Sequence, residues 1–338
     1  MTSRERVKRC LEFDRPDRAP RDCWITPSAQ PRHGEAAMQA FRERWPSDFT
    51  QPDVGRQPAS RVRGNPTSIG LYVDEWGCEF ENIQEGVIGE VKHPMVSDWS
   101  KLDLVQPPTE MLSVDVNAVN DFCRKTDKYT VAGGWARPFE RIQFLRGTEN
   151  IYYDLADESA ELLELIRRVH DFDCRQYQTW AKTDCDALAM MDDWGSQRSL
   201  LISPAQWRRI FKPLYAEYVR IAHDAGKHFW MHSDGHITDI YEDLIEIGVD
   251  AINSQLFCMD IEEIGRRFAG RIAFWGEVDR QHILPHGSPA DVRAAVERVV
   301  RNIWRPEGGC IAQFEFFGAV PMANADAVFQ AWQELTAR

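Results

Sequence analysis

The sequence predicts an α/β fold, a closed (β/α)8 barrel that forms one domain over residues 1–338. Three observations carry this prediction. Eight segments have strand character, and most of them are followed by a helical pattern. Glycines that stop a helix before the next strand stand at Gly226, Gly248 and Gly270. No glycine-rich phosphate loop is present, which favours a closed barrel over an open sheet.

The order of the elements follows from hydrophobic periodicity and from turn residues. The expected strands are 19–25, the region 71–76, 129–135, 187–191, 228–231, 249–253, 271–275 and 310–314. The expected helices are 142–145, 158–179, 204–225, 237–247, 261–269 and 289–303. Ser203 and Ser288 each stand before a proline, as a capping residue does at a helix start. The charged start of the chain forms an N-terminal extension, and residues 32–67 are expected to form a long loop near the mouth.

The composition is that of an ordinary globular protein, with 43% hydrophobic and 28% charged residues. The formal net charge is −13, and no cluster of Lys and Arg is interleaved with aromatic residues, so we expect no nucleic-acid partner. There is no run of about 18 apolar residues and no apolar leader, so we expect no membrane span and a cytoplasmic protein. The eight cysteines are scattered, which argues against both a disulfide framework and a structural zinc site.

The most informative motif is His232-Ser233-Asp234-Gly235, which ends the short apolar run 229–231. It places an imidazole and a carboxylate at the carboxyl end of a strand, where parallel α/β folds usually do chemistry. Residues i and i+2 of an extended chain face the same side, so His232 and Asp234 are expected to act together.

Polar and aromatic side chains also follow most of the other expected strands. They are Asp74, Glu75, Trp76, Trp135, Arg137, Glu140, Asp192, Asp193, Trp194, Asn253, Gln255, Glu277, Asp279 and Glu315. An acidic residue after a strand is often only the N-cap of the next helix, which stabilises the fold by ~1 kcal/mol. That alternative has equal weight for Asp193 and Asp279, and Asn253 could instead close a backbone turn.

Three kinds of chemistry suit such a cluster, and the residues alone do not choose between them. Imidazole nitrogen and carboxylate oxygens could bind a divalent metal and leave a position open for substrate. A carboxylate beside an imidazole could act as a general acid/base pair. The same groups could also orient a polar ligand by hydrogen bonds alone.

Several runs resemble the uroporphyrinogen decarboxylase superfamily. The strongest are DDWGSQRSLLISPAQWRRIFKPLY (192–215) and HSDGHITDIYEDLIEIGVDAINSQ (232–255). The runs RERVKRCLEFDRPDRAP (4–20), DEWG (74–77), FWGEVDRQHILPHGSPADV (274–292) and GGCIAQFEF (308–316) are similar to the branch that includes corrinoid-dependent methyltransferases. The resemblance spans nearly the whole chain and implies a (β/α)8 barrel with its site in a deep mouth.

The resemblance implies two kinds of reaction. True uroporphyrinogen decarboxylases carry an arginine-rich N-terminal motif, and the matching segment 21–34 lacks its pattern, so porphyrinogen decarboxylation is not expected. The methyltransferase branch binds zinc through a His-x-Cys pair and a late Cys. His232 matches that histidine, Asp234 stands in place of the first cysteine, and Glu315 stands near the late one. These three residues therefore form the expected metal set, for zinc or a harder divalent metal.

The favoured prediction is a methyltransferase that moves a methyl group between a corrinoid protein and a small molecule, with tetrahydrofolate as one acceptor. The expected catalytic residues are His232, Asp234, Glu277 and Asp192. The expected substrate-binding residues are Trp24, Asp74, Trp76, Arg137, Trp194, Asn253 and Gln255. The alternatives are a cofactor-free decarboxylase of a carboxylated substrate and a non-catalytic binder of a tetrapyrrole or corrinoid. Relatives of this kind are often homodimers, so a homodimer is expected.

Overall fold

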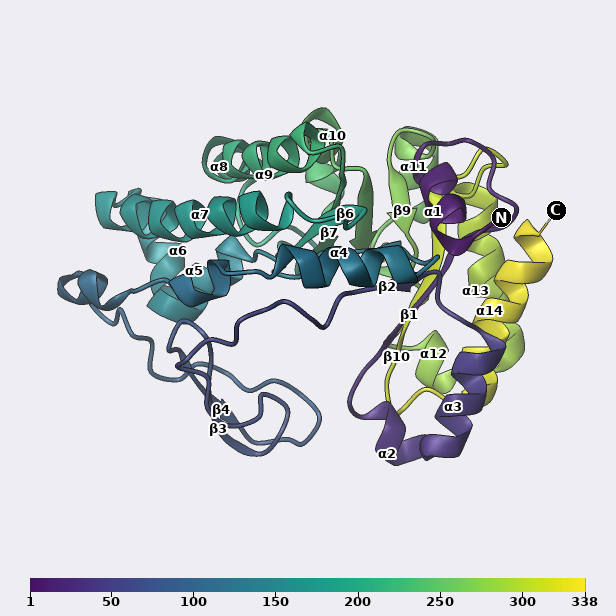
Figure 1. The fold of residues 1–338 in the computed structure, drawn as a ribbon, viewed down its shortest axis with the longest axis horizontal. Helices are drawn as coiled ribbons and strands as arrows, with labels where there is room; N and C mark the ends of the chain where they lie inside the picture. Colours follow the sequence, from purple (N-terminus) through teal and green to yellow (C-terminus); the bar gives the residue numbers. More distant parts are fainter. Residues whose placement is uncertain (338) are drawn as a thin grey trace.

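The computed structural model describes residues 1–337, and its centre is a curved parallel sheet with helices on the outer face (Figure 1). Six strands pair in the order β1-β10-β9-β8-β7-β6, and every neighbouring pair is parallel. Their bounds are Arg21–Ile25 (β1), Cys310–Phe316 (β10), Ala273–Trp275 (β9), Ala251–Ser254 (β8), His228–Ser233 (β7) and Ala187–Met191 (β6). The chain is therefore a TIM-barrel-like α/β fold.

Two further strands continue the curve of the sheet, but they do not complete a closed barrel of hydrogen-bonded strands. β2 (Phe49–Thr50) and β5 (Tyr129–Thr130) form a separate parallel pair. Isolated parallel bridges, one of them between Val131 and Ala187, join the segment after β5 to β6. A single backbone hydrogen bond from the residue before β2 reaches β1. Within residues 1–337 no continuous ladder runs around all eight strands, so the closed barrel is confirmed only in its barrel-like curvature.

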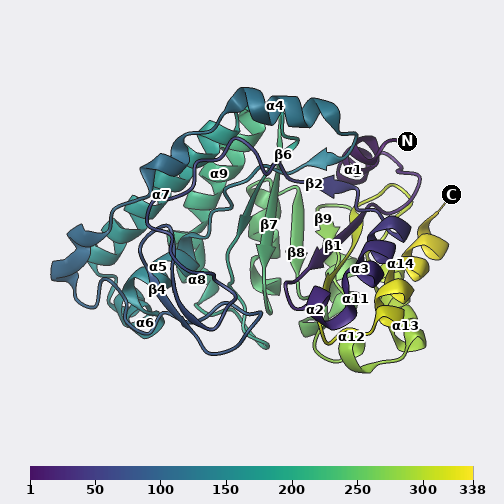
Figure 2. The ribbon, with the colours of Figure 1, turned by 60° about the horizontal axis from the view of Figure 1, so that its bottom comes forward.

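The helices follow the strands and cover the outside of the sheet, with α7 and α9 on one side and α13 and α14 on the other (Figure 2). The α-helices are α1 (Ser3–Leu11), α2 (Ala29–His33), α3 (Glu35–Arg44), α4 (Val116–Lys125), α5 (Pro138–Arg146), α6 (Thr148–Asp157), α7 (Ala160–Trp180), α8 (Pro204–Ile210), α9 (Lys212–Asp224), α10 (Tyr241–Glu246), α11 (Ile261–Phe268), α12 (Ile283–His286), α13 (Pro289–Asn302) and α14 (Met322–Thr336). Short 3-10 helices are Trp99–Leu104, Thr109–Leu112, Thr238–Ile240 and Leu256–Cys258.

The predicted helix boundaries are confirmed where the sequence has strong stop signals. Ser203 and Ser288 accept a hydrogen bond from a backbone N–H of the first turn of α8 and α13. Gly226, Gly248 and Gly270 have φ of 66°, 91° and 85° after their helices. The predicted helix 204–225 is two helices, because α9 starts afresh with a proline in its first turn.

The interior of the curve is a packed core that closes the end opposite the mouth. Inward side chains from the strands form one cluster with the apolar face of α1. Its members are Val7, Cys10, Leu11, Phe49, Tyr129, Val131, Ala187, Ala189, Trp230, Ala251, Ala273, Trp275 and Ile311. Alanines on neighbouring strands make room for the two tryptophans, whose ring centroids are 4.7 Å apart. The N-terminal extension therefore plugs the barrel-like sheet, and ligand access is left to the other end.

The predicted second strand is wrong, and the predicted long loop 32–67 is confirmed only over residues 51–67, where the chain has no helix or strand. The region 71–76 supplies β3 (Gly70–Val73), which pairs antiparallel with β4 (Glu79–Asn82) in a hairpin outside the central sheet. The second strand of the barrel order is β2, inside the segment 32–67 that was expected to be a loop, and α3 lies in the same segment. A strand of two residues shows no alternation of polar and apolar residues, so periodicity could not reveal it.

No helix within residues 1–337 is both long and apolar enough to cross a membrane.

Candidate active site

His232 is the penultimate residue of β7, so its imidazole lies at the carboxyl end of the sheet. His232 pairs with Met191 of β6 and Asn253 of β8 in the strand register, and its side chain is only 9% exposed. Burial at this end follows from the apolar run before it, which keeps β7 in the centre of the sheet.

Asn253 fixes which nitrogen of His232 faces the mouth. The amide nitrogen of Asn253 donates to the carbonyl of Trp275 at 2.6 Å and to Oε1 of Gln313 at 3.1 Å. The amide oxygen therefore faces His232, and it lies 2.6 Å from Nδ1. Because that oxygen can only accept, Nδ1 carries a hydrogen, and in the neutral imidazole Nε2 presents its lone pair to the mouth.

Two carboxylates flank this free nitrogen. Oδ1 of Asp193 lies 3.5 Å from Nε2 of His232, and Oδ1 of Asp234 lies 3.6 Å from it. One ligand atom from each of the three residues fits within a mutual distance of 4.8 Å. Oδ1 of Asp234 is buried and accepts no hydrogen bond from any described residue. The arrangement offers one nitrogen and two oxygens to a cation or a proton.

Glycines bring the two aspartates together. Gly195 follows Asp193 after β6, and its N–H donates to the carbonyl of Asp234 at 3.1 Å. The backbone N–H of Asp234 donates to Oδ1 of Asp193 at 2.8 Å. A Cβ on Gly235, which has a φ of 78°, would lie 2.1 Å from the carbonyl oxygen of Gly195. Only glycine at this crossing allows the two loops to approach so closely.

Arg280 neutralises the other side of the site. Its guanidinium forms a very short ion pair with Asp234, lies 2.6 Å from Oε2 of Glu315 and is 3.6 Å from Oε1 of Glu277. Burial raises the pKa of Glu277 well above its usual range, against the opposing charge of Arg280. The predicted metal set is thus brought together only in part, because Glu315 is held by Arg280 while Asp193 lies beside His232.

Asp192 lies beneath these groups and holds the start of α5. Its two carboxylate oxygens accept hydrogen bonds from the backbone N–H groups of Phe139 and Glu140, both at 2.9 Å. The hydroxyl of Tyr215 donates to the same carboxylate. Asp192 has no solvent exposure, and burial raises its pKa to about 7 although the three donors oppose the shift. Its predicted catalytic role stays a prediction, and its visible contacts are those of a helix cap.

A cavity of about 790 Å³ adjoins the imidazole through Trp24. The rings of Trp24 and His232 have centroids 5.1 Å apart, and Trp24 also contacts Trp135 at 6.3 Å. Four of the predicted substrate-binding residues line this cavity: Trp24, Asp74, Trp76 and Arg137. Asp74 is tied to the backbone of its own loop and to Arg141, so its oxygens are largely used.

The other predicted substrate-binding residues have different surroundings. Trp194 is fully buried, with its ring stacked on Phe139 at 4.0 Å between centroids. Gln255 accepts from the N–H of Gly235 at 3.0 Å and lines a smaller hollow of about 90 Å³ beside Arg280. Asn253 forms a hydrogen bond with His232 and does not line the cavity.

Glu140 is an acid of the cavity wall that the sequence placed at a strand end without a role. Burial raises its pKa to about 7, and the neighbouring carboxylates Asp193 and Asp192 add to the shift while Arg137 opposes it. A carboxyl group that titrates near neutral pH can give or take a proton at the cavity surface.

The sequence matches the uroporphyrinogen decarboxylase (URO-D) family over residues 65–335. The chain belongs to the URO-D family. Its structure is similar to a methyltransferase from Methanosarcina mazei, with a TM-score of 0.67, 14% identity and 99% of both chains covered. It is less similar to an endo-beta-1,4-xylanase from Gloeophyllum trabeum, with a TM-score of 0.45, 11% identity and 95% and 99% of the two chains covered. No curated protein sequence matches the chain significantly. At such low identities the structural likeness concerns the fold alone.

Two residues of this candidate site, Asp193 and Arg280, were not among the predicted catalytic, substrate-binding or metal-binding residues. Asp193 was weighed equally as a helix cap, and only the crossing of the two glycine loops brings it to His232. Arg280 was not singled out in the sequence, although it stands only three residues after Glu277.

Proposed function

We propose that this URO-D family member is a methyltransferase that moves a methyl group between a corrinoid carried by a partner protein and a small molecule bound in the cavity. The observation that carries the proposal is the imidazole of His232, which lies between two carboxylates beside a tryptophan-walled cavity. The likeness in fold to a methyltransferase from Methanosarcina mazei over 99% of both chains supports it.

Two features of the mouth suit a divalent metal. Asn253 keeps the hydrogen of His232 on Nδ1, which leaves Nε2 as a ligand atom, as is usual for metal-bound histidines. The buried Oδ1 of Asp234 has no hydrogen-bond partner among the described residues and faces the same point as Asp193. Asp193, His232 and Asp234 would hold the ion. A divalent metal such as zinc bound there would supply Lewis-acid activation of a heteroatom on the substrate.

The cavity suits a flat small molecule. Its volume of about 790 Å³ falls in the range of small-ligand sites, and Trp24 and Trp135 offer aromatic faces near His232. Arg137, 32% exposed, supplies a positive charge whose nearest carboxylate, on Glu140, is 3.9 Å away. A pterin such as tetrahydrofolate, or an aromatic methyl donor, has the shape and polarity that these walls would accept.

The test is methyl transfer itself. The purified chain is incubated with methylcobalamin and, separately, with tetrahydrofolate and a panel of thiols and phenols. The proposal predicts loss of the absorbance of the methyl–cobalt bond with at least one acceptor, and a slower loss with His232→Ala. Unchanged methylcobalamin with every acceptor argues against methyl transfer.

A second candidate function is decarboxylation without a cofactor, and Glu140 is the observation that favours it. A buried carboxyl group with a pKa of about 7 on the cavity wall could protonate the carbon that loses carbon dioxide. Release of carbon dioxide from a carboxylated substrate in the presence of a chelator, lost in Glu140→Gln and kept in His232→Ala, would favour this reaction over methyl transfer.

A further inference from the structure

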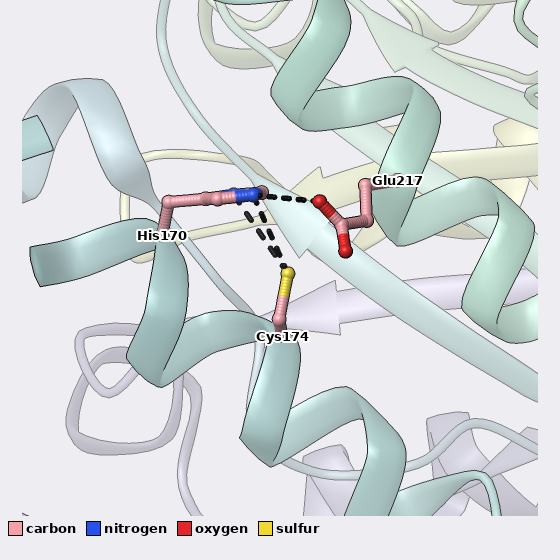
Figure 3. Close-up of side chains that lie close together, drawn as sticks. All are labelled: His170, Cys174 and Glu217. Atoms are coloured by element: carbon pink, nitrogen blue, oxygen red, sulfur yellow. Dashed lines mark hydrogen bonds and ion pairs between the residues drawn. The ribbon is translucent and has the colours of Figure 1, made fainter. Parts of the chain in front are cut away.

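A second cluster of metal-ligand side chains lies away from the mouth, where helices α7 and α9 pack together. His170 and Cys174 stand one turn apart on α7, and Glu217 comes from α9 (Figure 3). Nε2 of His170 is 3.0 Å from Oε2 of Glu217 and 3.6 Å from Sγ of Cys174. One ligand atom from each of the three side chains fits within a mutual distance of 4.8 Å.

The three ligand types and their spacing match those of a zinc site. Zinc prefers sulfur, imidazole nitrogen and carboxylate oxygen in tetrahedral geometry. With Zn–S near 2.3 Å and Zn–N near 2.0–2.1 Å, a tetrahedral ion holds the sulfur and nitrogen ~3.6 Å apart, and nitrogen and oxygen ~3.3 Å apart. The observed distances of 3.6 Å and 3.0 Å lie close to these values.

The imidazole is also supported from behind, as metal-bound histidines are. Nδ1 of His170 lies 3.0 Å from the hydroxyl of Tyr218, which is fully buried and reaches the carboxylate of Asp173 at 3.5 Å. This contact holds the ring so that Nε2 faces Glu217. His170 also lines a hollow of about 350 Å³, together with side chains of α7, α8 and α9 such as Ile166, Ile210 and Leu214.

We propose that His170, Cys174 and Glu217 bind a zinc ion that cross-links α7 and α9, with water as the fourth ligand. The site is separate from the mouth and goes beyond the proposed function. Binding replaces the thiol proton of Cys174, which leaves to solvent, and Glu217 binds as a carboxylate. Sγ now lies 3.8 Å from Nδ1 as well, over the face of the ring, so the thiol turns toward Nε2 when the ion binds.

The sequence argued against a structural zinc site because no two cysteines are paired. The proposed site departs from that expectation, since only one sulfur is needed when another helix supplies a carboxylate. His170 and Cys174 have the i, i+4 spacing that places two ligands on one helix face, and Glu217 is 47 residues away from His170 in sequence.

Cobalt titration of the full-length, chelator-treated protein tests the site, because a thiolate bound to Co²⁺ gives a sulfur-to-metal charge-transfer band and the mouth cluster offers no sulfur. We expect the band to appear as Co²⁺ is added, to saturate at one equivalent in His232→Ala, which lacks the imidazole of the mouth cluster, to disappear on addition of Zn²⁺, and to be absent in Cys174→Ser. Cys258→Ser is the matched control, because Cys258 is a half-buried thiol that lines the hollow of about 90 Å³ beside Arg280. The second control, His232→Ala, removes the imidazole from the mouth cluster of Asp193, His232 and Asp234. Both variants should keep the band.

A thermal measurement covers the case in which a variant folds poorly. Zn²⁺ should raise the Tm of the parent protein and of His232→Ala, and it should leave the Tm of Cys174→Ser and Glu217→Gln closer to their metal-free values. Circular dichroism confirms that each variant is folded. The absence of a charge-transfer band in the parent protein at saturating Co²⁺ overturns the proposal, and so does a band that survives in Cys174→Ser. In either case the cluster is an ion pair with a neighbouring thiol.

Discussion

Removal of the Asp192 carboxylate should lower the free energy of unfolding of the protein strongly, because this buried group accepts three hydrogen bonds. In Asp192→Ala three buried donors lose their acceptor: the N–H groups of Phe139 and Glu140 and the hydroxyl of Tyr215. Each buried donor left without a partner costs ~1–3 kcal/mol. Burial of the Asp192 carboxyl group itself costs free energy, so its removal offsets part of this loss of stability. We therefore expect the free energy of unfolding to fall by ~3–5 kcal/mol, a large fraction of the stability of an ordinary domain.

Urea unfolding followed by circular dichroism measures this effect. Asp192→Asn keeps one acceptor oxygen, so its loss should be about half as large, ~1–3 kcal/mol. Asp193→Ala is the matched control, because that side chain is 40% exposed and accepts one backbone hydrogen bond, and it should lose less than ~1 kcal/mol. A loss below ~1 kcal/mol in Asp192→Ala, with the same loss in Asp193→Ala, would refute the assignment of Asp192 as the cap of α5.

Three further predictions concern the mouth and the cavity. Asn253→Leu removes the acceptor that orients His232, so divalent-metal affinity at the mouth, measured by competition with a chelating dye, should fall ~10–100-fold; equal affinity would show that Asn253 has no such role. Glu140→Gln should flatten the pH dependence of the free energy of unfolding. In the parent protein burial raises the pKa of Glu140 to about 7, so the stability that this group contributes below pH ~4.3 is lost as the pH rises through 7, by up to ~1.4 kcal/mol per pH unit. Parallel curves of unfolding free energy against pH for the parent protein and the variant would contradict this. Gly235→Ala should lower the Tm by several degrees, because its Cβ would lie 2.1 Å from the carbonyl oxygen of Gly195; an unchanged Tm would mean that the two loops do not cross so closely.

The sequence predicted the second half of the fold well because that half has strong periodicity and punctuation. Strands β6 to β10 were located to within two residues at each end, and the family resemblance is confirmed by the match over residues 65–335. The first half has two strands of two residues each and an antiparallel hairpin. Such short strands are held by tertiary contacts with α1 and the interior core, which leave no local pattern.

The position of the site was predictable, and its detailed partners were not. The motif at His232 and Asp234 indicated the carboxyl end of a central strand, and the structure brings these side chains together there. The approach of Asp193 depends on two glycines from different loops, and the ion pairs of Arg280 join residues on three separate segments. No sequence spacing indicates contacts between segments that are far apart in the chain, so these contacts could be identified only from the structure.

We propose that His232 and its two carboxylates form the reactive centre of a methyl-transferring enzyme. The most direct test is the rate at which the methyl–cobalt absorbance of methylcobalamin disappears in the presence of the best acceptor, measured for the parent protein, His232→Gln and Asp193→Asn. We expect the rate to fall ~100-fold or more in His232→Gln and by less in Asp193→Asn, with the rate of the exposed control His286→Gln unchanged. A parent-like rate in His232→Gln would contradict it.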